Sequence, residues 1–249
     1  MNGGQERRVA IVTGAARNIG RATAVALARQ GFQVLVHSGS DREGAETTAG
    51  LAEAESVQAG AFIGDLTDPA TAETLVTAAR GLGTPAVLVN NAALRRAVAF
   101  EEMDLEEWRN VLAVNLDAAF LCSRAVIGEM LALGWGRIIN IGGLSGHTGA
   151  AGRAHVVTSK AALVGFSKAL AIEYAGRGVT ANCVVPGEIE TQRGASAGAR
   201  GVHPGKGPPP VGRRGRPEEV ATVIAMLCAP ESDYLTGQTF HVNGGSYLP

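Results

Sequence analysis

Short apolar segments alternate along the chain with longer segments in which apolar residues recur at helical spacing. The short segments, such as VAIV at residues 9–12, are apolar at consecutive positions, which is typical of strands covered on both faces. Asp68 precedes one of the longer segments as its expected N-cap, and Gly128 is expected to interrupt another weakly. The pattern predicts strands at 9–12, 32–37, 57–63, 86–91, 137–141, 179–185 and 238–242, and helices at 19–27, 41–55, 69–80, 105–133, 156–175 and 217–227.

The alternation of strands and helices predicts the fold class. Apolar strands separated by helices form an α/β protein with a doubly wound parallel sheet, so we expect about seven strands with helices on both faces, a Rossmann-like arrangement. The length of 249 residues, 46% of them apolar, suits one domain spanning residues 1–249. Neither an internal repeat nor a second domain is expected.

Residues 192–216 break the pattern. The segment is rich in glycine and proline, with three consecutive prolines at 208–210, so it cannot form one regular helix. We expect a flexible, basic substrate lid, and the alternative is a solvated charged segment without a binding role. Its basic residues, with no acid between Glu190 and Glu218, are Arg193, Arg200, Lys206, Arg213, Arg214 and Arg216.

Charge and cysteine content exclude several functions. A net charge of −1 and an aromatic content of 4% favour neither nucleic acid nor an anionic membrane surface as a partner. The first residues lack an apolar signal region, and no later run is expected to be long enough to span a bilayer. Cys122, Cys183 and Cys228 are scattered and odd in number, which indicates reduced, buried thiols. We therefore expect a cytoplasmic protein.

The first strand and helix enclose a turn suited to a phosphate. Gly14 directly follows the strand at 9–12, and apolar residues from Ile19 onward resume at helical spacing. Such a turn directs backbone N–H groups and the positive helix end at a ligand, for which a diphosphate is the usual guest. Glycine is needed where a Cβ would stand between backbone and phosphate. The alternative is a glycine turn that serves only tight packing.

This turn, TGAARNIG at residues 13–20, resembles the TGxxxGxG cofactor loop of the short-chain dehydrogenase/reductase family. Asn18 replaces the middle glycine, and asparagine tolerates a positive φ better than other residues with side chains. Further matches cover nearly the whole chain: GDL at 64–66, NNAA at 90–93, VNLDAAF around Asn115, PGEIET at 186–191, and GRPEEVA and YLTGQTFHVNGG near the end. The chain is identified as a member of this family, most similar to its 3-oxoacyl-[acyl-carrier-protein] reductase-like members.

The resemblance implies a nicotinamide dinucleotide cofactor and a homotetramer or homodimer built through the two long helices. The residues expected to bind the cofactor are Gly14, Arg17, Asn18, Ile19, Gly20, Ser38, Asp65, Leu66, Asn91, Ala92, Lys160, Pro186, Gly187, Ile189 and Thr191.

The end of the second strand bears on which cofactor is used. An acid near this point holds the adenosine ribose 2′-OH in dinucleotide folds and would repel a 2′-phosphate. Ser38 occupies the position, and Arg17 in the glycine loop would meet the phosphate, so we expect NADP(H) to be preferred. Asp41 and Arg42 are close enough to leave NAD(H) open, and Arg17 has the alternative of being an exposed arginine at a helix start.

The family's catalytic motif is incomplete. The family pattern is Tyr-x-x-x-Lys with a serine thirteen residues before the tyrosine, whereas this chain has Val156 and Gly143 at those positions. Asn115 and Lys160 match the other two catalytic residues. Valine has no proton to give and glycine has no hydroxyl to hold an oxyanion, so other groups must act if the chain is an enzyme. The expected replacements are His155, His147 and Ser145, and the alternative is that both histidines are polar residues with no task.

Two functions follow from these residues. The first is an NADP-dependent oxidoreductase acting on a carbonyl or alcohol of the 3-oxoacyl type with an atypical active site. The second is a cofactor-binding protein without redox activity, either a partner subunit or an enzyme of another reaction class. An anionic or thioester-linked small-molecule substrate is favoured by Arg95, Arg96 and the basic lid. The alternative is that these residues form a solvated run of charges without a role in substrate binding.

Overall fold

The computed structural model describes residues 7–192 and 209–249. It contains one parallel sheet of seven strands in the order β3-β2-β1-β4-β5-β6-β7. The strands are β1 (Arg8–Val12), β2 (Gln33–Ser38), β3 (Ala59–Ile63), β4 (Thr84–Asn90), β5 (Gly136–Ile141), β6 (Val179–Pro186) and β7 (Thr239–Val242). The fold class predicted from the sequence is confirmed.

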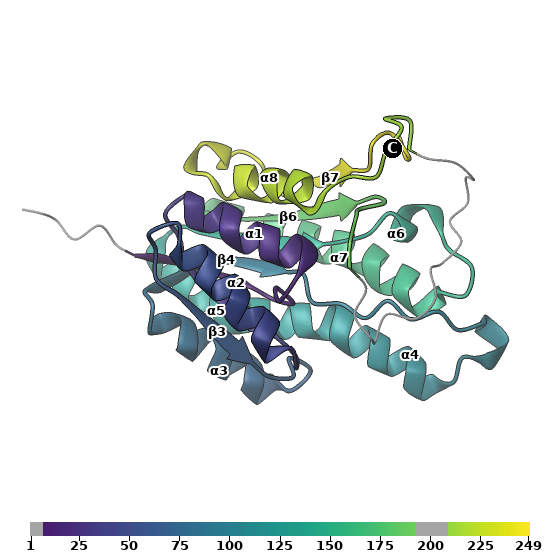
Figure 1. The fold of residues 1–249 in the computed structure, drawn as a ribbon, viewed down its shortest axis with the longest axis horizontal. Helices are drawn as coiled ribbons and strands as arrows, with labels where there is room; N and C mark the ends of the chain where they lie inside the picture. Colours follow the sequence, from purple (N-terminus) through teal and green to yellow (C-terminus); the bar gives the residue numbers. More distant parts are fainter. Residues whose placement is uncertain (1–6, 193–208) are drawn as a thin grey trace, which may run out of the picture.

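Helices cover both faces of this sheet (Figure 1). The α-helices are α1 (Asn18–Arg29), α2 (Arg42–Glu53), α3 (Pro69–Arg80), α4 (Leu105–Leu112), α5 (Ala118–Leu133), α6 (Ser145–Thr148), α7 (Ala154–Tyr174) and α8 (Pro217–Cys228). Short 3₁₀ turns lie at Phe100–Glu102, Ala175–Arg177 and Pro230–Ser232. The expected N-cap of α3 is present, because the Asp68 carboxylate accepts a hydrogen bond from the backbone N–H of Ala70.

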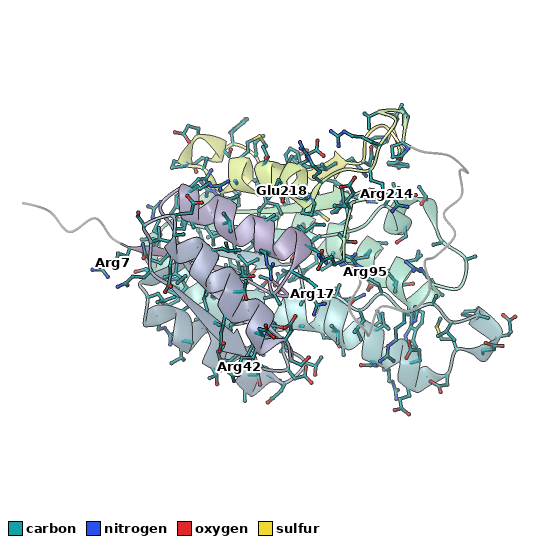
Figure 2. The ribbon with its side chains drawn as sticks, in the orientation of Figure 1. Arg7, Arg17, Arg42, Arg95, Arg214 and Glu218 are labelled. Atoms are coloured by element: carbon teal, nitrogen blue, oxygen red, sulfur yellow. The ribbon has the colours of Figure 1, made fainter. Side chains whose placement is uncertain are left out.

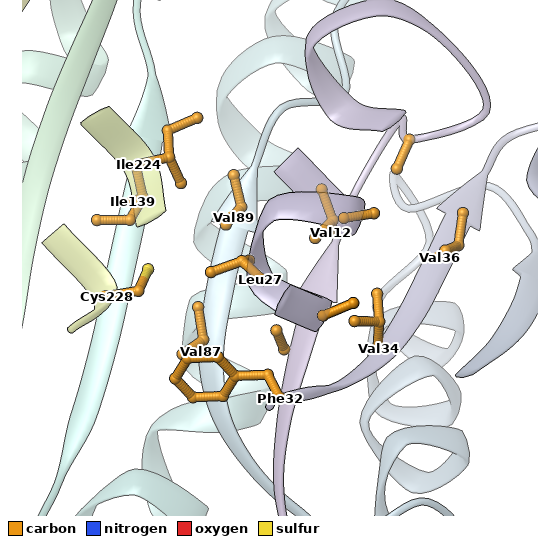
Figure 3. Close-up of a cluster of buried hydrophobic side chains, with 14 of the residues drawn as sticks. Val12, Leu27, Phe32, Val34, Val36, Val87, Val89, Ile139, Ile224 and Cys228 are labelled. Atoms are coloured by element: carbon orange, nitrogen blue, oxygen red, sulfur yellow. The ribbon is translucent and has the colours of Figure 1, made fainter. Parts of the chain in front are cut away.

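Each strand contributes alternate residues to two cores, because successive side chains point to opposite faces of a sheet. Ala10 and Val12 of β1 face α1, α2 and α8, whereas Val9 and Ile11 face α3 and α5. The consecutive apolar residues Val9–Val12 of β1 are therefore all buried. Figure 3 shows the first core, with side chains that include Val12, Leu27, Phe32, Val34, Val36, Val87, Val89, Ile139, Ile224 and Cys228.

The segment 105–133 differs from its prediction. Gly128 lies within a continuous α5, and the interruption is instead a π-helical turn at Ala113–Asp117. The segment is also long and apolar enough to cross a membrane by length and composition, so the expectation that no run has that length was wrong. Its side chains Cys122, Val126 and Met130 are buried against the sheet in the second core, as in the core helix of a globular domain.

The order of the strands reverses between β1 and β4, since the chain returns from β3 at one edge to β4 on the other side of β1. Ligands bind in open α/β sheets at the carboxyl ends of the strands beside such a reversal. The described part of the predicted lid lies close to this edge. Its residues 209–216 are described, and Gly215 exchanges backbone hydrogen bonds with Glu188 and Glu190. Arg193, Arg200 and Lys206 lie outside the described residues.

Candidate cofactor and active site

A cavity of about 760 Å³ lies at this reversal of strand order. Its walls come from the glycine loop, from the ends of β2 to β6 and from α7, and Figure 2 labels Arg17, Arg95 and Arg214, three of the basic residues around it. All fifteen residues expected to bind the cofactor line this cavity, and so do Ser145, Gly143 and Val156. Asn115, His147 and His155 are not among its lining residues.

The glycine loop has the geometry that a diphosphate site requires. Gly14 has φ +60°, and a Cβ on it would lie 2.7 Å from Cα of Ala92. Asn18 has φ 53°, as expected for the residue that replaces the family's middle glycine. In α1 no side chain caps the N-terminus and no acid lies in its first turn, so the first backbone N–H groups remain available at the cavity wall.

His37 fixes this loop, a role that the sequence analysis missed. Its Nδ1 accepts a hydrogen bond from the backbone N–H of Gly14 (3.2 Å), and its Nε2 therefore donates to the carbonyl of Gly64 (2.9 Å). Burial lowers the pKa of His37, which keeps the ring neutral and able to make both bonds. The sequence feature that could have indicated this role was the histidine at the end of the apolar run FQVLVH.

The adenosine end of the cavity pairs an acid with a base. Nη2 of Arg17 lies 2.5 Å from Oδ2 of Asp41, whose other oxygen accepts from the backbone N–H of Gly44 and caps α2. Oγ of Ser38 accepts from the backbone N–H of Asp41 (3.1 Å). Arg17 is thus part of the cavity wall rather than only a solvent-facing arginine. Asp65 holds the next loop through Oδ1, which accepts from both the backbone N–H and the hydroxyl of Thr67.

Lys160 lies at the inner end of the cavity. Its Nζ donates to the carbonyl oxygen of Ile141 over 2.7 Å. Burial, together with the smaller effect of the positive charge of Arg95, lowers the pKa of Lys160 to about 7. Val156 lies one helical turn before it, and a Cβ on Gly143 would lie 3.5 Å from Cγ of Lys160. The wall beside the lysine therefore carries no hydroxyl at either position where the family motif has one.

Asn115 braces the walls of the site rather than facing the cavity. It lies in the π-helical turn, where its Oδ1 accepts from the backbone N–H of Leu94 (2.7 Å). Its Nδ2 donates to the carbonyl of Leu94 (3.1 Å) and to Oγ of Ser159 (3.0 Å). The amide thus joins the loop after β4 to α7, next to the helical turn that holds Lys160.

His155 is not among the residues that line the cavity, which does not favour its expected role as a proton donor. That assignment needed a non-helical start to α7, but the helix begins at Ala154 and rotates His155 toward α4. The ring is fully buried, with Nδ1 accepting from the backbone N–H of Val156 and Nε2 lying 3.3 Å from Oε1 of Glu107. Arg96 pairs with the same carboxylate over 2.6 Å, so its expected role in receiving a substrate tail is not supported either.

His147 is also directed away from the cavity. Its ring packs against the rings of His241 and Tyr247, with centroids 4.6 Å and 5.5 Å away. Burial lowers the pKa of both histidines, and the pKa of His241 is lowered further by His147. Ser145, at the first position of the same short helix α6, does line the cavity. Of the three expected replacement residues, only this serine lines the cavity.

Arg153 is a further cavity residue that the sequence analysis missed. It is the N-cap residue of α7, only 8% exposed, and it lines the cavity. The sequence feature that could have identified Arg153 was its position three residues before Val156, because residues at that spacing share a helix face.

Within residues 7–192 and 209–249, no three His, Cys, Asp or Glu side chains gather as a metal site would need.

Comparison with known proteins decides the family. A family model described as enoyl-(acyl carrier protein) reductase matches residues 14–247. The 3-oxoacyl-[acyl-carrier-protein] reductase of Escherichia coli is 40% identical to this chain over 98% of both chains. The chain belongs to the short-chain dehydrogenase/reductase family. The predicted resemblance is confirmed over nearly the full length.

Other members of the short-chain dehydrogenase/reductase family are similarly close. The 3-oxoacyl-[acyl-carrier-protein] reductase of Synechocystis is 42% identical over 97% of both chains. The crystal structure of acetoin dehydrogenase YohF from Salmonella typhimurium matches with a TM-score of 0.86 and 34% identity, covering 96% of both chains. These relatives are oxidoreductases, and the chain shares their fold from end to end.

Proposed function

We propose that the protein is an NADP(H)-dependent oxidoreductase that interconverts a carbonyl and an alcohol on a 3-oxoacyl-like substrate, with an atypical active site. The observation that carries this proposal is the single cavity that joins an uncapped helix N-terminus at one end to the buried Lys160 at the other. The cofactor, when bound, supplies or accepts a hydride. The chain's own residues bind the cofactor and the substrate, orient them and transfer the proton.

The cofactor-facing residues divide by position along the cavity. The N-terminus of α1 suits the diphosphate, and Arg17 with Ser38 suits a 2′-phosphate on the adenosine ribose. Asp65 and Leu66 would contact adenine, and Asn91 and Ala92 its ribose. Lys160 would hold the nicotinamide ribose, and residues 186–191 the nicotinamide itself.

The proton on the substrate oxygen needs a source other than tyrosine. Val156 has none to give, and both histidines considered from the sequence are directed elsewhere. Lys160 and Ser145 line the cavity close in sequence or on the helix to Val156 and Gly143, and both carry exchangeable protons. An ammonium whose pKa is about 7 loses its proton readily near neutral pH, so we assign proton delivery to Lys160 and orientation of the substrate oxygen to Ser145.

A second candidate function is cofactor binding without redox chemistry. It is favoured by Val156 and Gly143, which give the cavity wall an apolar surface where the family motif has two hydroxyls. NADPH oxidation in the presence of acetoacetyl-coenzyme A separates the two functions. Turnover that is abolished in Lys160→Met supports the reductase, whereas tight NADPH binding without turnover of any carbonyl compound supports the second function.

The remaining features of the proposal concern assembly and location. We propose a homotetramer or homodimer formed through the long helices α5 and α7, because Phe120 and Ile172 on these helices are 48% and 90% exposed. Cys122, Cys183 and Cys228 are free and buried, in keeping with a cytoplasmic protein. The proposed partner is a small molecule, and neither nucleic acid nor a membrane is proposed.

A further inference from the structure

The charged residues of the cavity are unevenly distributed. Among the described residues, five basic and three acidic side chains line it: Arg17, Arg95, Arg153, Lys160 and Arg214, with Asp41, Asp65 and Glu188. Each of these three acids is engaged by another side chain. Asp41 pairs with Arg17, Asp65 accepts from Thr67, and Glu188 lies 3.4 Å from Arg214. The end of the cavity that contains Lys160 is therefore its basic end.

Two elements bring the cations of this end together. Arg95 lies in the loop after β4, and this loop contacts the residues just before α7, because the backbone N–H of Val98 donates to the carbonyl oxygen of Gly152 over 2.8 Å. The positive charge of Arg95 also contributes to lowering the pKa of Lys160. Lys160 lies in α7, four residues after Val156, and Arg153 is the N-cap residue directly before this helix. Residues four apart share one face of a helix, and Arg153 lines the same cavity, so cations precede and follow Val156 on the cavity side.

The residues that replace the family's catalytic pair leave room beside these cations. Gly143 carries no side chain, and Val156 is much smaller than a tyrosine. Guanidinium groups bind a carboxylate through paired N–H donors, and such charge-assisted bonds are about twice as strong as neutral ones. An anion placed here would also relieve the repulsion between Arg95 and Lys160.

We propose that Arg95 and Arg153 form a carboxylate-binding subsite beside Val156 and Lys160, so that the substrate is a small oxo or hydroxy acid bound as its anion. This inference rests on the proposed oxidoreductase function for the reaction of the substrate, but the binding of the carboxylate does not depend on that function. Arg95 and Arg153 hold the carboxylate, and the apolar side chain of Val156 packs against the adjoining carbon atoms. The subsite selects an acid over its neutral ester.

Isothermal titration calorimetry with the NADP⁺ complex tests the subsite without turnover. The probes are acetoacetate and methyl acetoacetate, which differ by the charge on the carboxyl group. We expect acetoacetate to bind at least about tenfold more tightly than the ester, and Arg95→Gln and Arg153→Gln each to remove most of that difference. Equal affinity for the two probes in the unmodified protein would overturn the inference.

Arg96→Gln is the matched control, because Arg96 adjoins Arg95 but pairs with Glu107 and does not line the cavity. It should change acetoacetate affinity by less than about twofold. Arg153 is buried, so Arg153→Lys is measured beside Arg153→Gln, and NADP⁺ affinity reports whether each variant is folded. If Arg153→Lys still binds acetoacetate more tightly than the ester, the positive charge at position 153 is what the subsite needs. If Arg96→Gln and Arg95→Gln lose the same amount of acetoacetate affinity, the subsite is contradicted.

The same probes separate this inference from the proposed function. Binding of acetoacetate that depends on Arg95, without NADPH oxidation by any carbonyl compound, would retain the subsite and reject the oxidoreductase. Reduction of methyl acetoacetate, without preferential binding of acetoacetate, would retain the oxidoreductase and reject the subsite.

Discussion

Arg17 and Asp41 form an ion pair across the adenosine end of the cavity, with Nη2 and Oδ2 2.5 Å apart. The pair joins the glycine loop to the start of α2, so it places a positive and a negative group where the adenosine ribose is expected. An arginine favours a 2′-phosphate there, and an acid favours a 2′-hydroxyl. We therefore expect the choice between NADP(H) and NAD(H) to depend on these two side chains.

Replacing the arginine should weaken NADPH binding selectively. Arg17→Gln removes the charge that faces the 2′-phosphate, so we expect the Kd for NADPH to rise about tenfold and the Kd for NADH to change by less than about threefold. Titration of cofactor fluorescence measures both values. Arg42→Gln is the control, because Arg42 lies beside Asp41 but pairs with Glu46 on the exposed face of α2. An equal loss of affinity for the two cofactors in Arg17→Gln would contradict the assignment.

Protonation of Lys160 should control the reduction rate. The pKa of this lysine is lowered to about 7, so the ammonium that gives the proton is present below that pH and is lost as pH rises through it. We therefore expect kcat/KM for reduction to fall above about pH 7. Lys160→Met should lower kcat/KM at least about a hundredfold. A profile that stays flat to high pH in the unmodified protein would show that another group supplies the proton.

Buried histidines should make the fold sensitive to acid. Burial lowers the pKa values of His37, His147 and His241 in the folded protein, whereas the unfolded chain takes up protons near the ordinary value of 6.5. The stability that neutral histidines provide is thus complete above about pH 6.5 and is lost as pH falls, by at most about 1.4 kcal/mol per pH unit for each histidine. Urea unfolding at pH 7.5 and about pH 5.5 measures the loss.

A matched pair of variants locates this effect. His147→Phe keeps a ring against His241 and Tyr247 but removes one titrating group and the repulsion it exerts, so stability should depend less steeply on pH. Tyr247→Phe keeps both histidines and should leave the dependence unchanged. A His147→Phe variant as sensitive to acid as the unmodified protein would show that this cluster does not carry the effect.

Restoring the family pair should raise activity on neutral substrates. Tyrosine at position 156 would lie one helical turn from Lys160, whose charge favours the phenolate. Gly143 does not have a positive φ, and a Cβ there makes only ordinary contact with Lys160, so serine fits without strain. We expect Val156→Tyr with Gly143→Ser to increase reduction of methyl acetoacetate about a hundredfold, with the single Val156→Tyr in between. Unchanged rates in folded, NADPH-binding variants would contradict this account of the missing residues.

The sequence predicted the parts of the structure that depend on local pattern. The strands and most helices follow from apolar periodicity, and the positive φ of Asn18 follows from its place in the glycine turn. The π-helical turn at Ala113–Asp117 was missed because it depends on the tertiary hydrogen bonds of Asn115 to Leu94 and Ser159. A glycine at 128 costs a helix too little to interrupt one that is packed against the sheet.

The site was only partly predictable for the same reason. Motif spacing identified residues that line the cavity, and most of them lie in the segments that follow strand ends. It could not orient His155, whose direction depends on where α7 begins, or His147, which packs against a histidine from β7. Arg153 lacks a motif and is recognised only when the cavity is assembled.

The central claim is that this cavity transfers hydride despite the missing tyrosine. The most direct measurement is mass spectrometry of the product formed from acetoacetate and from acetoacetyl-coenzyme A with NADPH deuterated at C4 of the nicotinamide, alongside the Lys160→Met variant. The account predicts a hydroxy product that carries one deuterium, formed by the unmodified protein and lost in Lys160→Met. Bound NADPH with no deuterium in any product, or equal incorporation by Lys160→Met, would contradict it.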